Sequence, residues 1–149
     1  MKNTLALSER PGGYEANHRS VRRYEELLWL RKNGFTRVVS LAPNLHDFEP
    51  YEAVGLRWAS FPISSPSHLQ KILLQLYRYL DTWIKQRERV LIHEEQLDDQ
   101  IMGVVAGYLL WSGKLESPPQ AIMIMERLVQ KQMGSLGRMV VSSIPINSK

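Results

Sequence analysis

The sequence contains no cysteine among its 149 residues. This absence excludes disulfide bonds, thiolate chemistry and any zinc site built on cysteine. Long apolar runs are also missing, since the longest one, Ile101 to Trp111, is too short to cross a bilayer. The first residues lack the basic, apolar and small-residue order of a signal peptide. Together these absences predict a cytoplasmic protein that makes no contact with membranes.

A strong excess of one charge is absent as well. The net charge is +4 and the sequence pI is about 9.5, which is below the charge density of a nucleic-acid-binding domain. No nucleic-acid partner is therefore expected. The early basic residues alternate with apolar ones, which indicates the solvated face of a helix rather than a binding patch. They are Arg19, Arg22, Arg23, Arg31, Lys32 and Arg37.

The most informative stretch begins at Arg89 and ends at Leu110. Val90–Ile92 is a short apolar run typical of a buried strand, and Ile101–Leu110 has the length and composition of a buried helix. A loop that joins a strand to a helix in this way points free N–H groups at one place, where an anion is normally held. Here the loop carries four carboxylates instead. They belong to Glu94, Glu95, Asp98 and Asp99.

This stretch resembles the signature of the cysteine-dependent protein tyrosine phosphatases, specifically their compact dual-specificity branch. In that family an apolar strand is followed by His-Cys-x-x-Gly-x-x-Arg-Ser/Thr and then by a helix of the type Gly-Thr-Val-Val-Ala-Ala-Tyr-Leu. The sequence keeps the histidine as His93 and the helix motif as Gly103–Leu109. The resemblance implies an α/β fold, with one phosphatase-like domain over residues 1–149. Its central, mostly parallel sheet would be flanked by helices.

None of the family's reactive groups is present in the loop from His93 to Ile101. Glu94 stands in place of the nucleophilic cysteine, and Leu97 in place of the loop glycine. Gln100 replaces the phosphate-binding arginine, and Ile101 replaces the hydroxyl that follows it. The resemblance therefore implies a pseudophosphatase with no catalytic residues and no cofactor. The remaining positions of this degenerate phosphate loop are Glu95, Gln96, Asp98 and Asp99.

The family's general-acid loop, usually Pro-Ile-x-Asp ahead of a helix, corresponds to the stretch that begins at Pro62. The aspartate position falls on Ser65, or on Ser64 if the register slips by one residue. A hydroxyl holds its proton too tightly at neutral pH to protonate a leaving group, so neither serine can serve as the acid. Ser65 is better suited to cap a helix whose first residue is Pro66.

Three interpretations of the four loop carboxylates stay open. Asp98 and Asp99 lie just before the helix, where carboxylates cap free N–H groups. An oxygen-rich loop also suits a hard cation, although the spacing matches no known calcium loop and no metal site is assigned. An altered catalytic centre with Glu94 as nucleophile would need cations to neutralise a phosphate, and the loop supplies none. His93 is interpreted as a structural histidine.

The sequence thus favours a catalytically inactive binding or scaffold module with a protein partner. A basic segment of that partner would suit the acidic loop. The alternatives are a metal-assisted hydrolase and a small-molecule binding protein, either of them using the carboxylate-rich loop. The partner's identity and the oligomeric state leave no local motif in the sequence.

Periodicity and turn signals predict the other elements. Strands are expected at 4–8, at the sheet edge, at 36–41, in its centre, and at 56–61. Tyr24, Leu27, Leu28 and Arg31 are expected to share one face of a first helix that ends at Gly34. A short helix or crossover is expected to end at Gly55. A long helix repeats apolar residues from Leu69 to Ile84.

Ser117 and Gln120 have the spacing of a capping box, which predicts the start of a last clear helix. Its buried side is expected to contain Ala121, Ile122, Met125, Leu128 and Val129. The tail over residues 134–149 has no assigned element, because Gly134, Gly137 and the serines interrupt any period.

Overall fold

The structure, a computed structural model, describes residues 4–13, 19–42, 48–63 and 68–144. The chain divides into two compact units. Unit 1 comprises Met1–Pro66 and Tyr79–Leu97, and unit 2 comprises Ser67–Arg78 and Asp98–Lys149. Within the described ranges, no helix is long and apolar enough to span a membrane.

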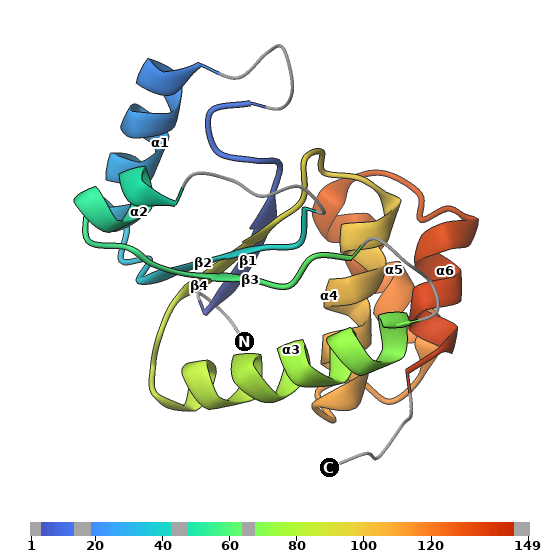
Figure 1. Cartoon of the computed structure of the whole chain (residues 1–149). Coiled ribbons are helices and arrows are strands. Elements are labelled where there is room, and N and C mark those ends of the chain that lie inside the picture. The colour runs from blue at the N-terminus through green and yellow to red at the C-terminus, as the bar shows by residue number, and fades with distance from the viewer. Residues whose placement is uncertain (1–3, 14–18, 43–47, 64–67, 145–149) are drawn as a thin grey trace. The chain divides into compact units, whose positions relative to one another are not determined.

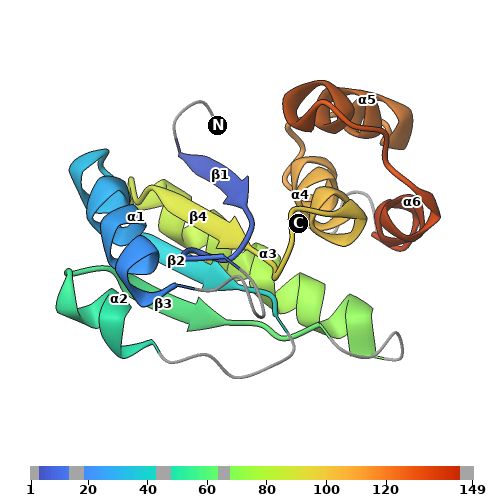
Figure 2. The ribbon, with the colours of Figure 1, turned by 90° about the horizontal axis from the view of Figure 1, so that it is seen from above.

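Unit 1 contains a four-stranded sheet in the order β1-β4-β2-β3 (Figure 2). All three pairings between these strands are parallel. The predicted α/β class with a parallel sheet is therefore confirmed, as are the edge position of the first strand and the interior position of the second. The strands are β1 (Leu5–Ser8), β2 (Arg37–Ser40), β3 (Arg57–Ser60) and β4 (Val90–His93).

One face of the sheet is covered by α1 (Ser20–Lys32) and α2 (Glu49–Ala53) (Figure 1). Val38 of β2 and Leu91 of β4 are register partners in neighbouring strands and therefore point to the same side. They form one apolar cluster with residues from both helices, from the turns that follow them and from the N-cap of α2: Leu27, Leu30, Phe35, Phe48, Tyr51 and Leu56.

The face of α1 that the sequence pattern predicts coincides only in part with its buried side. Leu27 is fully buried, but Tyr24 is 54% exposed and Arg31 is exposed, while Leu30 is buried instead. Apolar residues lie on more than one side of this helix, so their spacing alone does not select the side that packs. The predicted helix ends are confirmed, since Gly34 and Gly55 have φ angles of 86° and 83°, a region that glycine enters without steric cost.

The opposite face of the sheet meets the C-terminal part of α3 (Leu69–Lys85). The Arg37 guanidinium lies 4.2 Å from the centre of the Trp83 ring. It also forms two hydrogen bonds with the buried Glu88, from Nε to Oε1 at 3.0 Å and from Nη2 to Oε2 at 3.2 Å. This paired geometry offsets the cost of burying the carboxylate. It ties β2 to the turn that leads into β4.

The predicted apolar stripe of α3 is confirmed, because all of its members are buried or half-buried. The sequence prediction of this stripe did not include Tyr77, although its side chain is also fully buried. The hydroxyl of Tyr77 donates a hydrogen bond of 2.7 Å to the Val104 carbonyl oxygen. Burial raises the pKa of this hydroxyl.

Unit 2 contains α4 (Asp99–Trp111), α5 (Pro118–Val129) and α6 (Ser135–Ser142). The predicted cap of α5 is confirmed, since the Gln120 N–H donates to the Ser117 hydroxyl at 3.4 Å. The Gln120 side chain accepts from the Glu116 N–H. Ala121 and Met125 are buried as predicted, but the prediction for Leu128 is wrong because it is 65% exposed. Ile122 and Val129 are half-buried, so the predicted side is covered except at Leu128.

The tail left without an element contains α6, which packs closely on α4. A Cβ atom added to Gly103 would lie 2.6 Å from the Gly137 carbonyl oxygen and 2.8 Å from its Cα. A Cβ on Gly107 would lie 2.5 Å from the Tyr77 hydroxyl. Gly103 and Gly137 therefore let the α4 and α6 backbones approach more closely than larger side chains allow, and Gly107 leaves room for the Tyr77 side chain. Val140, Val141 and Ile144 are buried in this region.

Candidate functional site

The first half of the degenerate phosphate loop, His93 to Leu97, leaves the C-terminal end of β4 in unit 1. His93 is fully buried, and its Nδ1 lies 3.2 Å from the Glu94 carbonyl oxygen. The backbone carbonyl of His93 accepts a 2.9 Å bond from the Leu41 N–H. These contacts fit a histidine that orders the start of the loop.

The two glutamates after His93 lie in different surroundings. Glu94, which the sequence resemblance predicts to stand at the family's nucleophile position, is only 6% exposed. Glu95 forms an ion pair with Arg10, whose Nη1 lies 3.7 Å from Oε1, and both side chains are largely buried. The Arg10 N–H also donates to the Glu95 carbonyl oxygen at 3.4 Å. Gln96 is exposed.

Tyr51 of α2 reports on the charges in this region. Burial raises the pKa of its hydroxyl to about 12; the charge of Glu95 also raises it, while Arg10 and Arg23 oppose the shift. The carboxylate of Glu95 therefore lies among cations of unit 1 and interacts with a buried phenol.

The second half of the loop, Asp98 to Ile101, belongs to unit 2. Asp98 is the N-cap of α4, where its Oδ1 accepts a 3.2 Å bond from the Gln100 N–H. The prediction that one of the loop carboxylates caps this helix is confirmed. The backbone donor of Gln100, the residue in place of the family's arginine, is thus already used, and Ile101 is fully buried.

Asp99 does not cap its own helix but reaches the start of α6. Its carboxylate accepts hydrogen bonds from the Gly134 N–H and, at 2.7 Å, from the Gly137 N–H. A Cβ on Gly137 would lie 2.5 Å from the Asp99 carbonyl oxygen, so the position leaves no room for a larger residue. This contact was not predicted from the sequence. The local signal for it is the pair of glycines three residues apart, which was interpreted as an interruption of the tail's period.

The carboxylate and histidine side chains of the described residues do not form a metal centre. No three or more histidine, aspartate or glutamate side chains lie close enough together there to hold an ion. Ser64 and Ser65, the degenerate general-acid positions, lie outside the described residues, and so does the predicted cap at Ser65.

The chemistry available in the loop is therefore limited. Residues 94–101 supply no thiol and no lysine or arginine. The carboxylates of Asp98 and Asp99 accept hydrogen bonds from N–H groups at the starts of two helices, a role in which an anionic ligand would compete with them.

Comparison with known proteins identifies the fold. No family model matches the sequence, and no curated protein matches it. Solved structures do match. Tk-PTP in its active form is 22% identical, with 95% of this chain and 90% of that chain covered and a TM-score of 0.74.

Two further solved structures agree with this match. The kinase-associated phosphatase, with its catalytic cysteine replaced by serine, is 22% identical over 92% of this chain and 83% of its own, with a TM-score of 0.74. Human DUSP28 is 15% identical over 94% and 87%, with a TM-score of 0.70. The protein therefore has the fold of the dual-specificity and protein tyrosine phosphatases, in a chain without cysteine.

Proposed function

We propose that the protein is a catalytically inactive phosphatase-like domain that serves as a binding or scaffold module. The observation that carries the proposal is the replacement of the nucleophile by Glu94 in a chain that contains no cysteine. The family's reaction begins with a thiolate, and no other residue of this chain can provide one.

The electrostatics of the loop support the same proposal. Two like charges about 4 Å apart repel by about 1 kcal/mol in water and by about 4 kcal/mol at an effective dielectric near 20. A phosphate brought to Glu94 would meet this repulsion without an arginine at position 100 to offset it. Phosphate esters are therefore poor ligands for the loop.

Exposed apolar side chains on α1 support a protein partner. Val21, Tyr24 and Trp29 are 72%, 54% and 59% exposed. Aromatic side chains of this kind often contribute most to protein interfaces. The acidic loop gives less support to a basic partner segment than its sequence suggests, because Glu95 pairs with Arg10 while Asp98 and Asp99 bind backbone N–H groups.

Turnover measurements test the inactivity. The purified protein should hydrolyse neither aryl phosphates nor phosphopeptides, with or without added magnesium or manganese, and should not bind vanadate or tungstate in calorimetry. Metal-independent turnover that persists through purification would refute the proposal. Turnover that appears only with a divalent metal would instead support a metal-assisted hydrolase.

A repair variant provides the matched control. Glu94→Cys combined with Gln100→Arg should restore some oxyanion binding but little turnover. Leu97 occupies a position that is glycine in the family, and general acid catalysis alone commonly contributes about two to four orders of magnitude. Family-like rates in this double variant would show that an acid is still present.

A pull-down from the native host tests the binding role. The wild-type protein should capture a partner that is lost with Tyr24→Ala, if α1 is the contact surface, or with Glu95→Lys, if the loop is. Retention of every captured protein by both variants would argue against either surface.

A further inference from the structure

Unit 1 contains a cavity of about 400 Å³ between α1 and the edge strand β1. This volume lies within the range of small-molecule sites in proteins. One wall of the cavity is formed by residues 6–9, from β1 and its C-terminal end. The opposite wall is formed by α1. The lining residues that matter here are Ala6, Glu9, Arg22, Glu26, Trp29 and Phe35.

The interior of the cavity is apolar. Phe35, Leu30 and Leu91 belong to the buried cluster of unit 1, and Ala6 packs against that cluster. Trp29 also lines the cavity and is 59% exposed, which places its ring at the mouth. Two aromatic rings in one cavity suit a flat apolar ligand.

Three charged side chains form the rim. Arg22 donates from Nη2 to Glu9 Oε1 and from Nε to Glu26 Oε2, both at 3.0 Å. Glu26 Oε1 accepts a further bond of 2.7 Å from the Gly12 N–H. Two carboxylates and one guanidinium give the rim a net charge of −2 + 1 = −1.

We propose that this cavity binds a small organic cation with a flat apolar body and a single amine. The body would lie between Trp29 and Phe35, and the amine would lie at the rim, where Glu9 and Glu26 outnumber Arg22. A cation at this place is also suited to the face of an indole ring. The proposal does not use the degenerate phosphate loop, but it shares Trp29 with the exposed α1 side chains of the proposed function, so a protein partner bound there would compete with the ligand.

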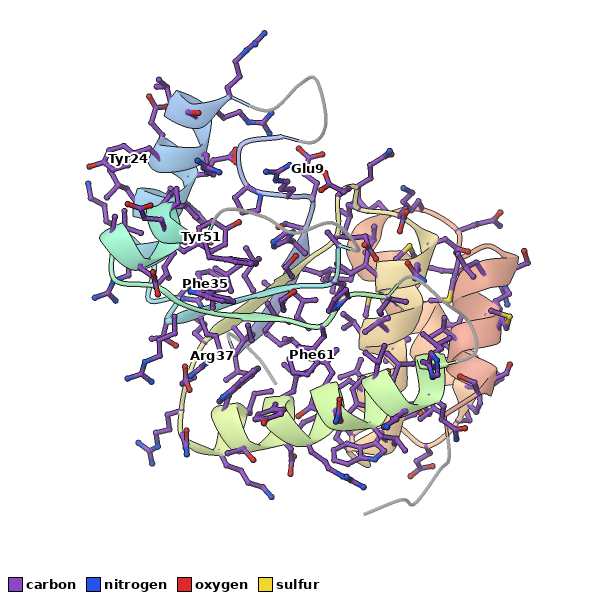
Figure 3. The ribbon with its side chains drawn as sticks, in the orientation of Figure 1. Glu9, Tyr24, Phe35, Arg37, Tyr51 and Phe61 are labelled. Atoms are coloured by element: carbon purple, nitrogen blue, oxygen red, sulfur yellow. The ribbon has the colours of Figure 1, made fainter. Side chains whose placement is uncertain are left out.

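The rim geometry favours a cation over an anion. The guanidinium of Arg22 is already shared between two carboxylates, so an incoming anion would compete with both. The side chain of Glu9 is 41% exposed, and its ion pair with Arg22 uses one of its two oxygens. Figure 3 shows Glu9 beyond the end of β1, Phe35 between α1 and the sheet, and Tyr24 on the side of α1 away from Glu9.

Three indoles that differ in charge test the proposal: tryptamine, 3-methylindole and indole-3-propionate, titrated into the ¹⁵N-labelled full chain. Exposed ion pairs are weak, so tryptamine should bind about two- to fivefold more tightly than 3-methylindole, with the propionate weakest. Amide shifts should concentrate at the cavity residues. Equal affinity for all three, shifts elsewhere, or no binding at millimolar concentration would overturn the proposal.

Two charge variants at the rim should change the affinity for tryptamine in opposite directions. Glu9→Gln should weaken tryptamine binding about two- to fivefold, and Arg22→Gln should strengthen it by a similar factor, since it removes the competing cation. Glu25→Gln, which removes an exposed carboxylate on the same helix outside the cavity, should leave the affinity unchanged. Ala6→Leu should reduce binding of all three indoles by filling the interior. Charge variants that both shift the affinity in one direction would contradict the proposed role of the rim.

Discussion

The two halves of the degenerate loop hold their carboxylates in different ways. In the first half, Glu94 is buried after β4 and Glu95 interacts with the side chain of Arg10. In the second half, Asp98 and Asp99 accept hydrogen bonds from backbone N–H groups at the starts of α4 and α6. The same chemical group is thus a side-chain partner in one half and a helix-capping group in the other.

This difference shows how carboxylates within a chain can occupy N–H groups at helix starts that could otherwise bind an anion. The start of a helix presents N–H groups whether or not a ligand is present, and donors without partners cost about 1–3 kcal/mol each when buried. The short side chain of an aspartate can satisfy them from within the chain. In the second half the carboxylates therefore stabilise the fold through hydrogen bonds to backbone N–H groups. In the first half the charge of Glu95 is balanced by the Arg10 side chain.

The largest expected effect comes from Gly137, which lies beside Asp99. Gly137→Ala would place a Cβ 2.5 Å from the Asp99 carbonyl oxygen and 2.6 Å from Met133 Cγ. Alanine is otherwise favoured over glycine inside a helix by roughly 0.5–1 kcal/mol, but overpacking against backbone costs about 1–3 kcal/mol or more. We expect a net loss of about 2 kcal/mol in the free energy of unfolding, measured with urea. Leu136→Ala, at a half-exposed neighbour on α6, serves as the control; an equal loss there would show that the close packing at Gly137 is not the cause.

Removal of the Asp99 carboxylate should cost slightly less. Asp99→Ala leaves the Gly134 and Gly137 N–H groups to water, with an expected loss of about 1.5 kcal/mol, within the range for an N-terminal capping group. Asp99→Asn keeps an acceptor without the charge and should lose about half as much. Hydrogen exchange should accelerate in α6 before it does in α5. If α6 keeps its protection in Asp99→Ala, the carboxylate does not hold that helix.

Much of the fold was predictable because its signals are local. The apolar run of β4, the stripe of α3 and the turn glycines Gly34 and Gly55 each identify an element without reference to the rest of the chain. The buried side of α1 was not predictable, since Val21 and Tyr24 are apolar but exposed. Only the position of a packing neighbour decides which side of such a helix is covered.

The site was predictable in part for a similar reason. The cap at Asp98 depends on its position just before α4, which the sequence gives directly. The contact of Asp99 with Gly134 and Gly137 joins residues that are 35 and 38 positions apart. Periodicity says nothing about such a distance, so the two glycines appeared only to interrupt the tail. The cavity beside Trp29 likewise depends on how β1 and α1 are placed.

Asp98 should contribute a smaller but clear amount. Asp98→Ala removes the acceptor for the Gln100 N–H, and loss of an N-cap typically costs about 1 kcal/mol. Asp98→Ser and Asp98→Asn should keep most of the stability, because both side chains can cap. Thermal unfolding should show a decrease of roughly 2–4 °C for the alanine variant. A similar decrease in the serine and asparagine variants would mean that charge, not capping, is what matters at this position.

The smallest effect is expected in the first half of the loop. Arg10 and Glu95 are largely buried, but their 3.7 Å separation is too long for a hydrogen bond between these two atoms, so we expect the pair to contribute no more than about 1 kcal/mol. Glu95→Ala should therefore cost less than Asp98→Ala, and the backbone bond from the Arg10 N–H to residue 95 should persist. A larger loss at Glu95 than at Asp98 and Asp99 would reverse the comparison between the two halves.

The pKa of the Tyr51 hydroxyl provides a second measurement of the charges in the first half of the loop, in addition to stability. Burial raises the pKa of its hydroxyl to about 12, Glu95 adds to the shift and Arg10 opposes it, so Glu95→Ala should lower this pKa and Arg10→Ala should raise it. Because the pKa is higher in the folded state than the ordinary value near 10, the corresponding stability is present below pH 10 and is lost as the pH rises through about 12. Absorbance at about 295 nm, with Tyr51→Phe subtracted, follows the titration of this phenol. If the two variants shift the titration in the same direction, Glu95 and Arg10 do not act on Tyr51 as an opposed pair of charges, and the first half of the loop is held by packing rather than by its cation.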